Sequence, residues 1–171
     1  MAVRIAKHQQ QRDMQQWQLV ECPLELSQLI PNLDKQHCYL LDCLTLWLNN
    51  ILMAALESET SDKEQYKNAE QDDLCCDGLS CDGIAAEIDE LVAQLIDSLK
   101  RCPANIVIVT NEVGQGIVPL GQQSRLFVDH AGWLNQKIAT IADEVTLVTA
   151  GLPMTLKSAK NYEQLSGSNN E

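Results

Sequence analysis

The sequence predicts an α/β protein with a mainly parallel sheet, because short apolar strands alternate with helices along the chain. Continuous apolar runs at residues 38–41 and 106–109 indicate two buried strands, since a parallel strand covered on both faces shows no alternation, and residues 145–148 predict a third strand. A long helical segment lies between each strand and the next. The order strand, helix, strand, helix, strand is typical of a parallel sheet with helices packed against it.

Helices are predicted on either side of these strands. The apolar residues of 84–101 recur every three or four positions, which indicates a helix with one buried face. Residues 44–56 predict a strongly apolar helix directly after the first strand. Further helices are expected at 23–30 and 122–141, and residues 2–12 are compatible with a weakly amphipathic one.

The length of 171 residues and a hydrophobic content of 45% indicate one globular domain, which we place at residues 1–157. The net charge is −12, and residues 57–90 hold twelve acids and two lysines, so most of the acidity is local. We expect residues 57–83 to form an acidic surface excursion and residues 158–171 to form a polar tail. The acidic balance argues against nucleic-acid binding, which needs a basic face, but not against nucleotides.

No apolar run reaches the roughly 18 residues that a membrane helix needs, and no signal peptide opens the sequence, so we expect a cytoplasmic protein. The seven cysteines are then expected to be reduced thiols. Three of them lie in or beside apolar runs and are expected in the core: Cys38, Cys43 and Cys102. Three in the acidic stretch lack the spacing of a zinc site, and a metal there is not favoured: Cys75, Cys76 and Cys81.

Two carboxylates follow predicted strands. Asp42 closes the strand at 38–41, and Glu112 follows the strand at 106–109. Ligands of parallel sheets bind beyond the carboxyl ends of the strands, so we expect the two side chains near each other at one edge. An aspartate after an apolar strand holds Mg²⁺ beside a nucleotide in many phosphate-transfer enzymes. The alternative is that Asp42 caps the next helix, with Thr45 in its first turn.

Residues 110–119, T-N-E-V-G-Q-G-I-V-P, predict a loop after the second strand. Gly114 and Gly116 would permit a close backbone approach or a positive φ, and Glu112 lies where a ligand would bind. The alternative is an ordinary turn between a strand and a helix, with a solvated glutamate.

His8 is a candidate nucleophile. A neutral imidazole can attack the α-phosphorus of a nucleoside triphosphate and release pyrophosphate. The alternative is an exposed histidine on a polar terminal helix. The other two histidines, His37 and His130, have no chemical context in the sequence.

Four ordered blocks of the sequence share a pattern with a known family. They are R-I-x-x-H…R…W…E from Arg4 to Glu21, L-L-D-C-L-T-L-W-L-N-N from Leu40 to Asn50, T-N-E-V-G-x-G-I-V-P at 110–119, and R-x-F-x-D-x-x-G-x-x-N-Q from Arg125 to Gln136. The run from Ala150 to Pro153, together with Lys157, extends the likeness. Together these blocks resemble the bifunctional adenosylcobinamide kinase/adenosylcobinamide-phosphate guanylyltransferase family over residues 3–157, apart from the acidic stretch.

The resemblance implies a P-loop fold of the RecA type, assembled as a homotrimer. It implies phosphorylation of adenosylcobinamide with ATP or GTP, followed by GMP transfer from GTP to adenosylcobinamide phosphate through a guanylylated histidine. His8 matches that histidine, and Asp42 matches the acid linked to Mg²⁺. Other matched residues are expected beside the nucleotide: Arg4, Glu21, Glu112, Gly114 and Gly116.

One block of the family pattern is not found in the sequence. The family opens with a strand and a G-x-x-x-x-G-K-S loop before the R-I-x-x-H block, and the 171 residues contain no such loop. The segment from Gly78 to Gly83 has the glycine spacing, but Ile84 replaces the lysine and no apolar strand precedes it. We therefore expect a sheet without the first strand and phosphate loop, and weak activity without the amides and lysine that bind the β- and γ-phosphates.

Two alternatives to an active enzyme of this family stay open at this point. One is a non-catalytic remnant or subunit that binds a corrinoid or a partner protein. The other is a different nucleotide-dependent enzyme on a similar scaffold.

Overall fold

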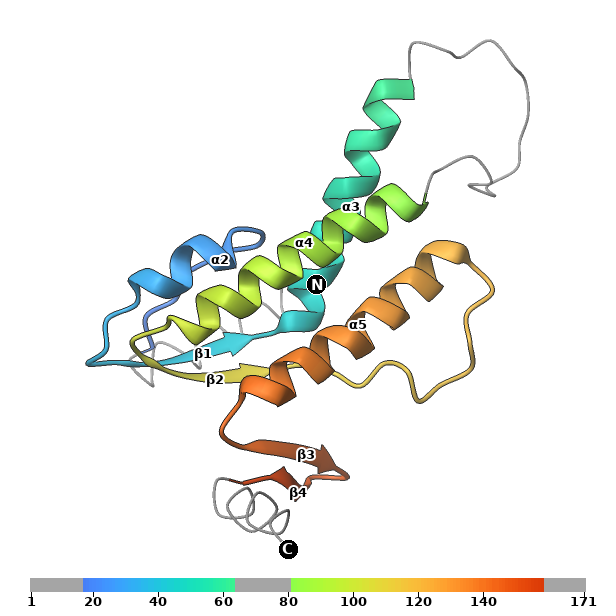
Figure 1. Cartoon of the computed structure of the whole chain (residues 1–171). Helices are drawn as coiled ribbons and strands as arrows, with labels where there is room; N and C mark the ends of the chain where they lie inside the picture. Colours follow the sequence, from blue (N-terminus) through green and yellow to red (C-terminus); the bar gives the residue numbers. More distant parts are fainter. Residues whose placement is uncertain (1–16, 64–80, 159–171) are drawn as a thin grey trace, which may run out of the picture.

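The computed structural model describes residues 17–63 and 81–158, and residues 1–16, 64–80 and 159–171 lie outside the described part. The elements in chain order are α2 (Leu26–Leu29), the 3-10 helix η1 (Ile30–Asn32), β1 (Cys38–Asp42), α3 (Leu44–Lys63), α4 (Cys81–Lys100), β2 (Asn105–Val109), α5 (Gln122–Ile141), β3 (Val145–Thr149) and β4 (Leu152–Lys157). A layer of helices lies over one face of the β1–β2 sheet (Figure 1).

The parallel pairing of the first two strands is confirmed. β1 and β2 run parallel, in a register that places Cys38 opposite Asn105 and Asp42 opposite Val109. The predicted burial of these strands is wrong, because the helices of the described part cover one face only. On that face Leu41, Ile106 and Ile108 pack against the core, whereas three apolar side chains of the other face are exposed: Leu40, Val107 and Val109.

The third predicted strand does not join the parallel sheet. β3 pairs antiparallel with β4, a strand that was not predicted, and the described strands form two separate two-stranded sheets. The reversal takes place at Ala150 and Gly151, whose φ angles are 53° and 78°. A two-residue hairpin loop of type I′ requires positive φ at both positions, so the local backbone turns the chain back on β3. The α/β class holds, and the prediction of a mainly parallel sheet holds for β1 and β2.

The helices agree with the sequence except at some of their ends. α5 spans the predicted residues 122–141, and α4 begins three residues before the predicted start at residue 84. α3 continues past the predicted end at residue 56 as far as Lys63, so residues 57–63 and 81–83 of the expected excursion are helical. Charged residues such as glutamate and lysine are good helix formers, and acidity alone therefore did not indicate where the helix ends. The remainder of the excursion, residues 64–80, and the predicted helix at 2–12 lie outside the described residues.

The core lies among the helices α2, α3, α4 and α5. Each long helix contributes residues at spacings of three and four, as an amphipathic helix must when it packs one face. Trp47 of α3 donates its indole N–H to the carbonyl of Leu24 over 2.9 Å and so fixes the segment before α2. Among the most deeply buried side chains are Ile30, Leu44, Leu48, Ile84, Ile88, Leu95 and Leu134.

The cysteine predictions are met in part. The described thiols Cys22, Cys38, Cys43 and Cys102 are free. Cys38 is exposed and does not belong to the core, because it begins β1 on the uncovered face of the sheet. Cys43 and Cys102 are half-buried. In the described part of the chain, no helix is long and apolar enough to cross a membrane.

Candidate functional site

Asp42 and Glu112 lie at the same end of the β1–β2 sheet. Asp42 is the last residue of β1 and pairs in register with Val109, the last residue of β2. Glu112 follows β2 by three residues. Because the strands are parallel, their carboxyl ends meet at one edge, and the predicted placement of both carboxylates at this edge is confirmed. Ligands of parallel α/β sheets bind at such an edge.

Asp42 presents an exposed carboxylate. Its side chain makes no hydrogen bond or ion pair within residues 17–63 and 81–158, so the interpretation of Asp42 as the cap of α3 finds no support there. The peptide bond between Asp42 and Cys43 is cis. Both carboxylate oxygens of Asp42 are thus available to a ligand.

Thr45, in the first turn of α3, ties that helix to the loop after β2. Its Oγ1 accepts hydrogen bonds from the backbone N–H of Asn111 at 2.9 Å and from the side-chain amide of Asn111 at 3.1 Å. Thr110 Oγ1 lies 3.4 Å from the same oxygen. The sequence suggested Thr45 only as part of a helix cap, whereas the structure gives it this link between two strand ends.

Asn135 reaches the same loop from α5. Its Nδ2 donates to Oε1 of Glu112 at 2.9 Å and to the backbone carbonyl of Asn111 at 3.2 Å, and its Oδ1 accepts from the Thr110 hydroxyl at 2.8 Å. Glu112 is exposed, as the alternative of a solvated glutamate expects, but one of its carboxylate oxygens is also held by Asn135. The available signal was an asparagine inside a helix, where its helix propensity is low and a side-chain role is often the reason.

The loop between Glu112 and α5 is anchored at its far end. Arg125 donates to the carbonyls of Pro119, at 3.3 Å, and of Leu120. Neither Gly114 nor Gly116 has a positive φ, so that half of the expectation is wrong, while a close backbone approach to a ligand stays a prediction. A Cβ on Gly114 would meet Val128 Cγ1 at an ordinary 3.9 Å, and one on Gly116 would meet nothing within 4 Å. The space beside Gly116 is therefore open, and neither glycine of the loop has left-handed backbone. Three large apolar side chains of the loop are exposed: Ile117, Val118 and Leu120.

Of the three remaining predicted site residues, Glu21 alone lies in the described part of the chain. Arg4 and His8 lie outside the described residues. Glu21 is exposed in the extended segment that leads to α2, and no hydrogen bond or ion pair joins its side chain to another described residue. Their proposed roles therefore depend on the sequence pattern.

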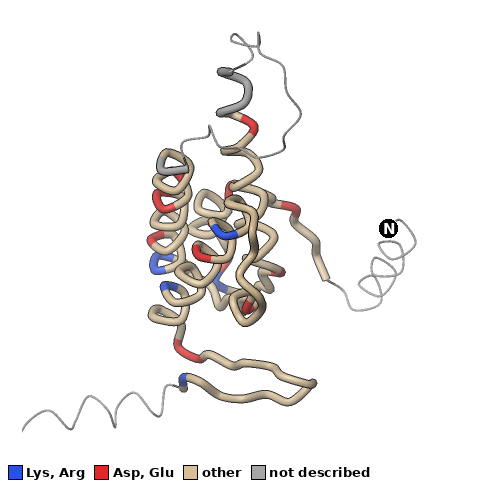
Figure 2. The backbone as a smooth tube through the Cα atoms, turned by 90° about the vertical axis from the view of Figure 1, so that its right-hand side faces the viewer, with Lys and Arg blue, Asp and Glu red and all other residues tan. Residues whose placement is uncertain are grey.

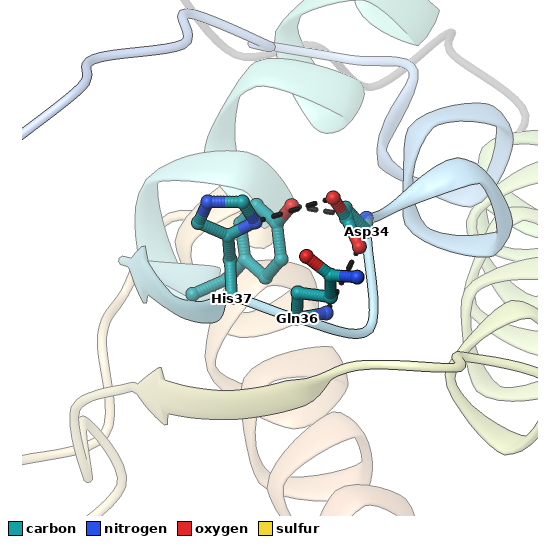
Figure 3. Close-up of polar contacts among 4 residues, drawn as sticks. Asp34, Gln36 and His37 are labelled. Atoms are coloured by element: carbon teal, nitrogen blue, oxygen red, sulfur yellow. Dashed lines mark hydrogen bonds and ion pairs between the residues drawn. The ribbon is translucent and has the colours of Figure 1, made fainter.

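His37 lies at the opposite end of the sheet, in the turn before β1. Its Nδ1 is 3.4 Å from Asp34 Oδ2, and its ring meets Tyr39 edge to face with centroids 6.5 Å apart. Asp34 also accepts from the Gln36 N–H at 2.9 Å, while the Asp34 N–H donates to the Tyr39 hydroxyl at 3.0 Å (Figure 3). These contacts organise an exposed turn at the amino end of β1, so His37 is not part of the carboxyl-edge site.

His130 is buried between α4 and α5, with 2% of its surface exposed. Burial lowers the pKa of its imidazole, an effect opposed by Asp89, whose Oδ1 lies 3.8 Å from Nδ1. The neutral imidazole is thus favoured, and the contact with Asp89 is not an ion pair between full charges. Asp89 also has Lys137 at 3.7 Å. The Nε2 of His130 is buried and has no hydrogen-bond partner among the described residues, and the ring meets Trp133 edge to face.

The positions of the basic residues in the described part are spread over several elements (Figure 2). They come from the turn before β1, the end of α4, both halves of α5 and the end of β4: Lys35, Lys100, Arg101, Arg125, Lys137 and Lys157. Between residues 17 and 158, leaving aside 64–80, no three histidine, cysteine or acidic side chains gather closely enough to hold a metal by themselves. A cation at this edge would need further ligands, such as the phosphate oxygens of a nucleotide.

Residues 1–156 match the protein family described as cobinamide kinase / cobinamide phosphate guanyltransferase. The bifunctional adenosylcobalamin biosynthesis protein CobP of Pseudomonas aeruginosa is 38% identical over 158 residues, which cover 92% of this chain and 75% of that protein. The bifunctional adenosylcobalamin biosynthesis proteins CobU of Salmonella typhimurium and Escherichia coli are 39% and 37% identical, each over 92% of this chain and 78% of their own lengths. The family match spans most of the chain, and each identity exceeds what fold similarity alone produces. This chain therefore belongs to the cobinamide kinase / cobinamide phosphate guanyltransferase family.

Proposed function

We propose that this protein phosphorylates adenosylcobinamide with ATP or GTP and then transfers GMP from GTP to adenosylcobinamide phosphate, as a step of cobalamin biosynthesis. Family membership supports both reactions, and the relatives are named as bifunctional adenosylcobalamin biosynthesis proteins. The observation that carries the proposal is the carboxyl edge of the β1–β2 sheet. There Asp42 is exposed at the end of β1, Asn135 holds Glu112, and the loop that carries Glu112 leaves open space beside Gly116.

In the first reaction, the hydroxyl of adenosylcobinamide attacks the γ-phosphorus of the triphosphate, and the nucleoside diphosphate leaves. The protein contributes positioning and charge stabilisation, because the transferred phosphoryl group needs little covalent help. The carboxylate of Asp42 fits a Mg²⁺ ligand, since it is exposed, has no described partner and offers the oxygen atoms that Mg²⁺ prefers. When bound there with phosphate oxygens, Mg²⁺ would neutralise charge on the triphosphate.

In the second reaction, a ring nitrogen of His8 attacks the α-phosphorus of GTP, and pyrophosphate leaves. The product is a phosphoramidate that links GMP to His8. A phosphate oxygen of adenosylcobinamide phosphate then attacks the same phosphorus, which forms adenosylcobinamide-GDP and frees the imidazole. His8 is proposed because it completes the R-I-x-x-H pattern. The residues proposed to line the nucleotide are Arg4, Glu21, Glu112, Gly114 and Gly116.

We also propose that the protein works as a cytoplasmic homotrimer. The β3–β4 hairpin supports self-association, because Leu152, Met154 and Leu156 alternate along one face of β4 and are all exposed. The hairpin extends beyond the end of α5 in both views (Figures 1 and 2). The free thiols of the described residues agree with a reducing compartment.

The two alternatives to an active family member gain no support from the relatives, which are named as bifunctional enzymes of one pathway. The test is product formation from adenosylcobinamide, Mg²⁺ and ATP, followed by GTP, with products identified by mass spectrometry. It is performed on the 171-residue chain and on the same chain preceded by a strand and a G-x-x-x-x-G-K-S loop of the family pattern.

We expect adenosylcobinamide phosphate and then adenosylcobinamide-GDP, at a higher rate in the second form because its loop supplies phosphate-binding amides and a lysine. Asp42→Ala should abolish both products, and His8→Ala only the second. Neither product from either folded form would contradict the proposal.

A further inference from the structure

Five polar residues from three parts of the chain form one connected network at the carboxyl edge. Thr45 comes from α3. Thr110, Asn111 and Glu112 come from the loop after β2, and Asn135 comes from α5, six residues before its end. Asn135 is the member that contacts the loop at three points. No role for Asn135 follows from the two proposed reactions themselves.

The orientation of the Asn135 amide is determined by its neighbours. Its amide nitrogen lies 3.2 Å from the backbone carbonyl of Asn111 and 2.9 Å from a carboxylate oxygen of Glu112. A carbonyl and a carboxylate oxygen can only accept hydrogen bonds, so the NH₂ group must face both of them. The side-chain carbonyl of Asn135 then faces Thr110 Oγ1 at 2.8 Å and must accept its proton.

The remaining donors follow from this orientation. The Thr110 hydroxyl donates its one proton to Asn135. The 3.4 Å contact between the two threonine hydroxyls is therefore a hydrogen bond only if Thr45 donates to Thr110. The oxygen of Thr45 then has its two lone pairs for the two N–H donors of Asn111. Every hydrogen bond in this set has one possible direction, and we call the set the Asn135 network.

We infer that Asn135 is a positioning residue that holds the Glu112 carboxylate at the nucleotide edge of the sheet, with the Thr110 hydroxyl supporting the other side of its amide. This inference rests on the proposed function. An exposed glutamate on a loop otherwise samples many rotamers, and fixing it before the substrate arrives removes that ordering cost from binding and reaction. Asn135 acts through Glu112 and need not contact substrate.

The kinetic test uses the active form of the chain from the product assay above. Asn135→Ala should lower kcat/KM for adenosylcobinamide phosphorylation by about 100-fold, the order expected when a reacting group is misplaced by about 1 Å. Asn135→Asp keeps the shape but removes both donors and places a second carboxylate beside Glu112, so it should lose at least as much. Thr110→Val should resemble Asn135→Ala, whereas Thr110→Ser keeps the hydroxyl and should stay within about threefold of wild type.

A double-mutant cycle separates positioning from a general structural effect. If Asn135 acts through Glu112, the variant with both Glu112→Ala and Asn135→Ala should be no slower than Glu112→Ala alone. Thr140→Val is the matched control, because within the described part of the chain the Thr140 hydroxyl bonds only to the backbone carbonyl of Gln136 in the same helix. It should leave kcat/KM unchanged. Thermal melts confirm that each variant is folded at the assay temperature.

A second readout does not depend on activity. The side-chain amide resonances of Asn135 can be followed by ¹⁵N NMR of the full chain. They should shift from their wild-type positions in Thr110→Val and keep those positions in Thr110→Ser and Thr140→Val. Absence of product from wild type would contradict the proposed function, and the NMR readout would then still test whether the Asn135 network forms. Unmoved resonances in Thr110→Val, or additive losses in the Glu112/Asn135 cycle, would overturn the inference.

Discussion

Asn111 donates both its backbone N–H and its side-chain amide to one oxygen, Oγ1 of Thr45, over 2.9 and 3.1 Å. The two residues are 66 positions apart in sequence, and the contact joins the start of α3 to the loop that follows β2. Asp42 lies three residues before Thr45, and Glu112 directly follows Asn111. A single threonine hydroxyl therefore links the two backbone segments that carry the candidate acidic residues.

Thr45→Val should weaken this link while nearly keeping the shape of the side chain. The two Asn111 donors lose their acceptor, and we expect unfolding free energy to fall by about 1 kcal/mol, the typical net value of a hydrogen bond. Urea denaturation measures this loss, and Thr45→Ser, which keeps the hydroxyl, is the control. Equal unfolding free energies for Thr45→Val and Thr45→Ser would show that these hydrogen bonds do not contribute to stability.

Leu44 and Leu46 offer a matched pair of leucines in the first turn of α3. Leu44 has 0% of its surface exposed and Leu46 has 62%. Leu44→Ala should therefore lower unfolding free energy by about 2–5 kcal/mol through lost burial and a cavity. Leu46→Ala should change it by about 0.5 kcal/mol or less. Equal losses in chemical denaturation would mean that the helical layer does not pack as described.

Much of the architecture follows from the sequence, and the exceptions have local causes. The parallel pairing of β1 with β2 was predictable because both strands are apolar runs separated by helices, and α5 was predictable from its periodicity. β4 was not, because it contains Pro153, a residue that sheets tolerate mainly at edges. The turn before it uses Ala150 at positive φ, where glycine or asparagine would have given a clear signal.

His130 should make stability depend on pH. Its folded-state pKa lies below the 6.5 of an ordinary histidine, chiefly because the ring is buried, with Asp89 and Asp129 opposing and Lys137 reinforcing the shift. Below pH 6.5 the unfolded chain binds this proton more readily than the folded chain does. The corresponding contribution to stability is therefore full above pH 6.5 and is lost as pH falls toward the folded-state pKa.

The comparison of wild type with His130→Phe isolates this effect. Phenylalanine fills the site without a titrating nitrogen and removes the buried Nε2, which has no hydrogen-bond partner in the described structure. In urea denaturation between about pH 5 and pH 8, wild type should lose stability relative to His130→Phe as the solution becomes more acidic. A constant difference between the two proteins across this range would contradict the assignment.

The sequence predicted the two carboxylates of the candidate site, but it did not predict that Asn135 contacts Glu112. Asp42 and Glu112 follow apolar strands, and the topology of parallel sheets brings strand ends together. The bond between Asn135 and Glu112 depends on how far α5 is rotated about its axis, which the sequence pattern does not specify. The glycines at 114 and 116 suggested left-handed turns because of their residue type, but neither has a positive φ in the loop that Arg125 anchors.

The exposed face of the hairpin should support self-association. Replacing Met154 with aspartate introduces a charge among the apolar side chains of β4, which would be costly to bury in an interface. We expect sedimentation velocity to report a trimer for wild type and a smaller species for Met154→Asp. Thr146→Asp, at an exposed polar position of β3, is the control and should leave the assembly unchanged. A monomeric wild type would contradict the proposed homotrimer.

Covalent labelling by GTP carrying the label on its α-phosphorus tests the central claim most directly. With Mg²⁺ present, the chain preceded by the phosphate loop should take up label in a bond that acid cleaves and base does not, as expected for a phosphoramidate. His8→Ala should abolish the label, His37→Ala should retain it, and the 171-residue chain alone should label more weakly. Equal labelling of the His8→Ala variant and wild type would contradict the assignment of His8 as the residue that carries GMP.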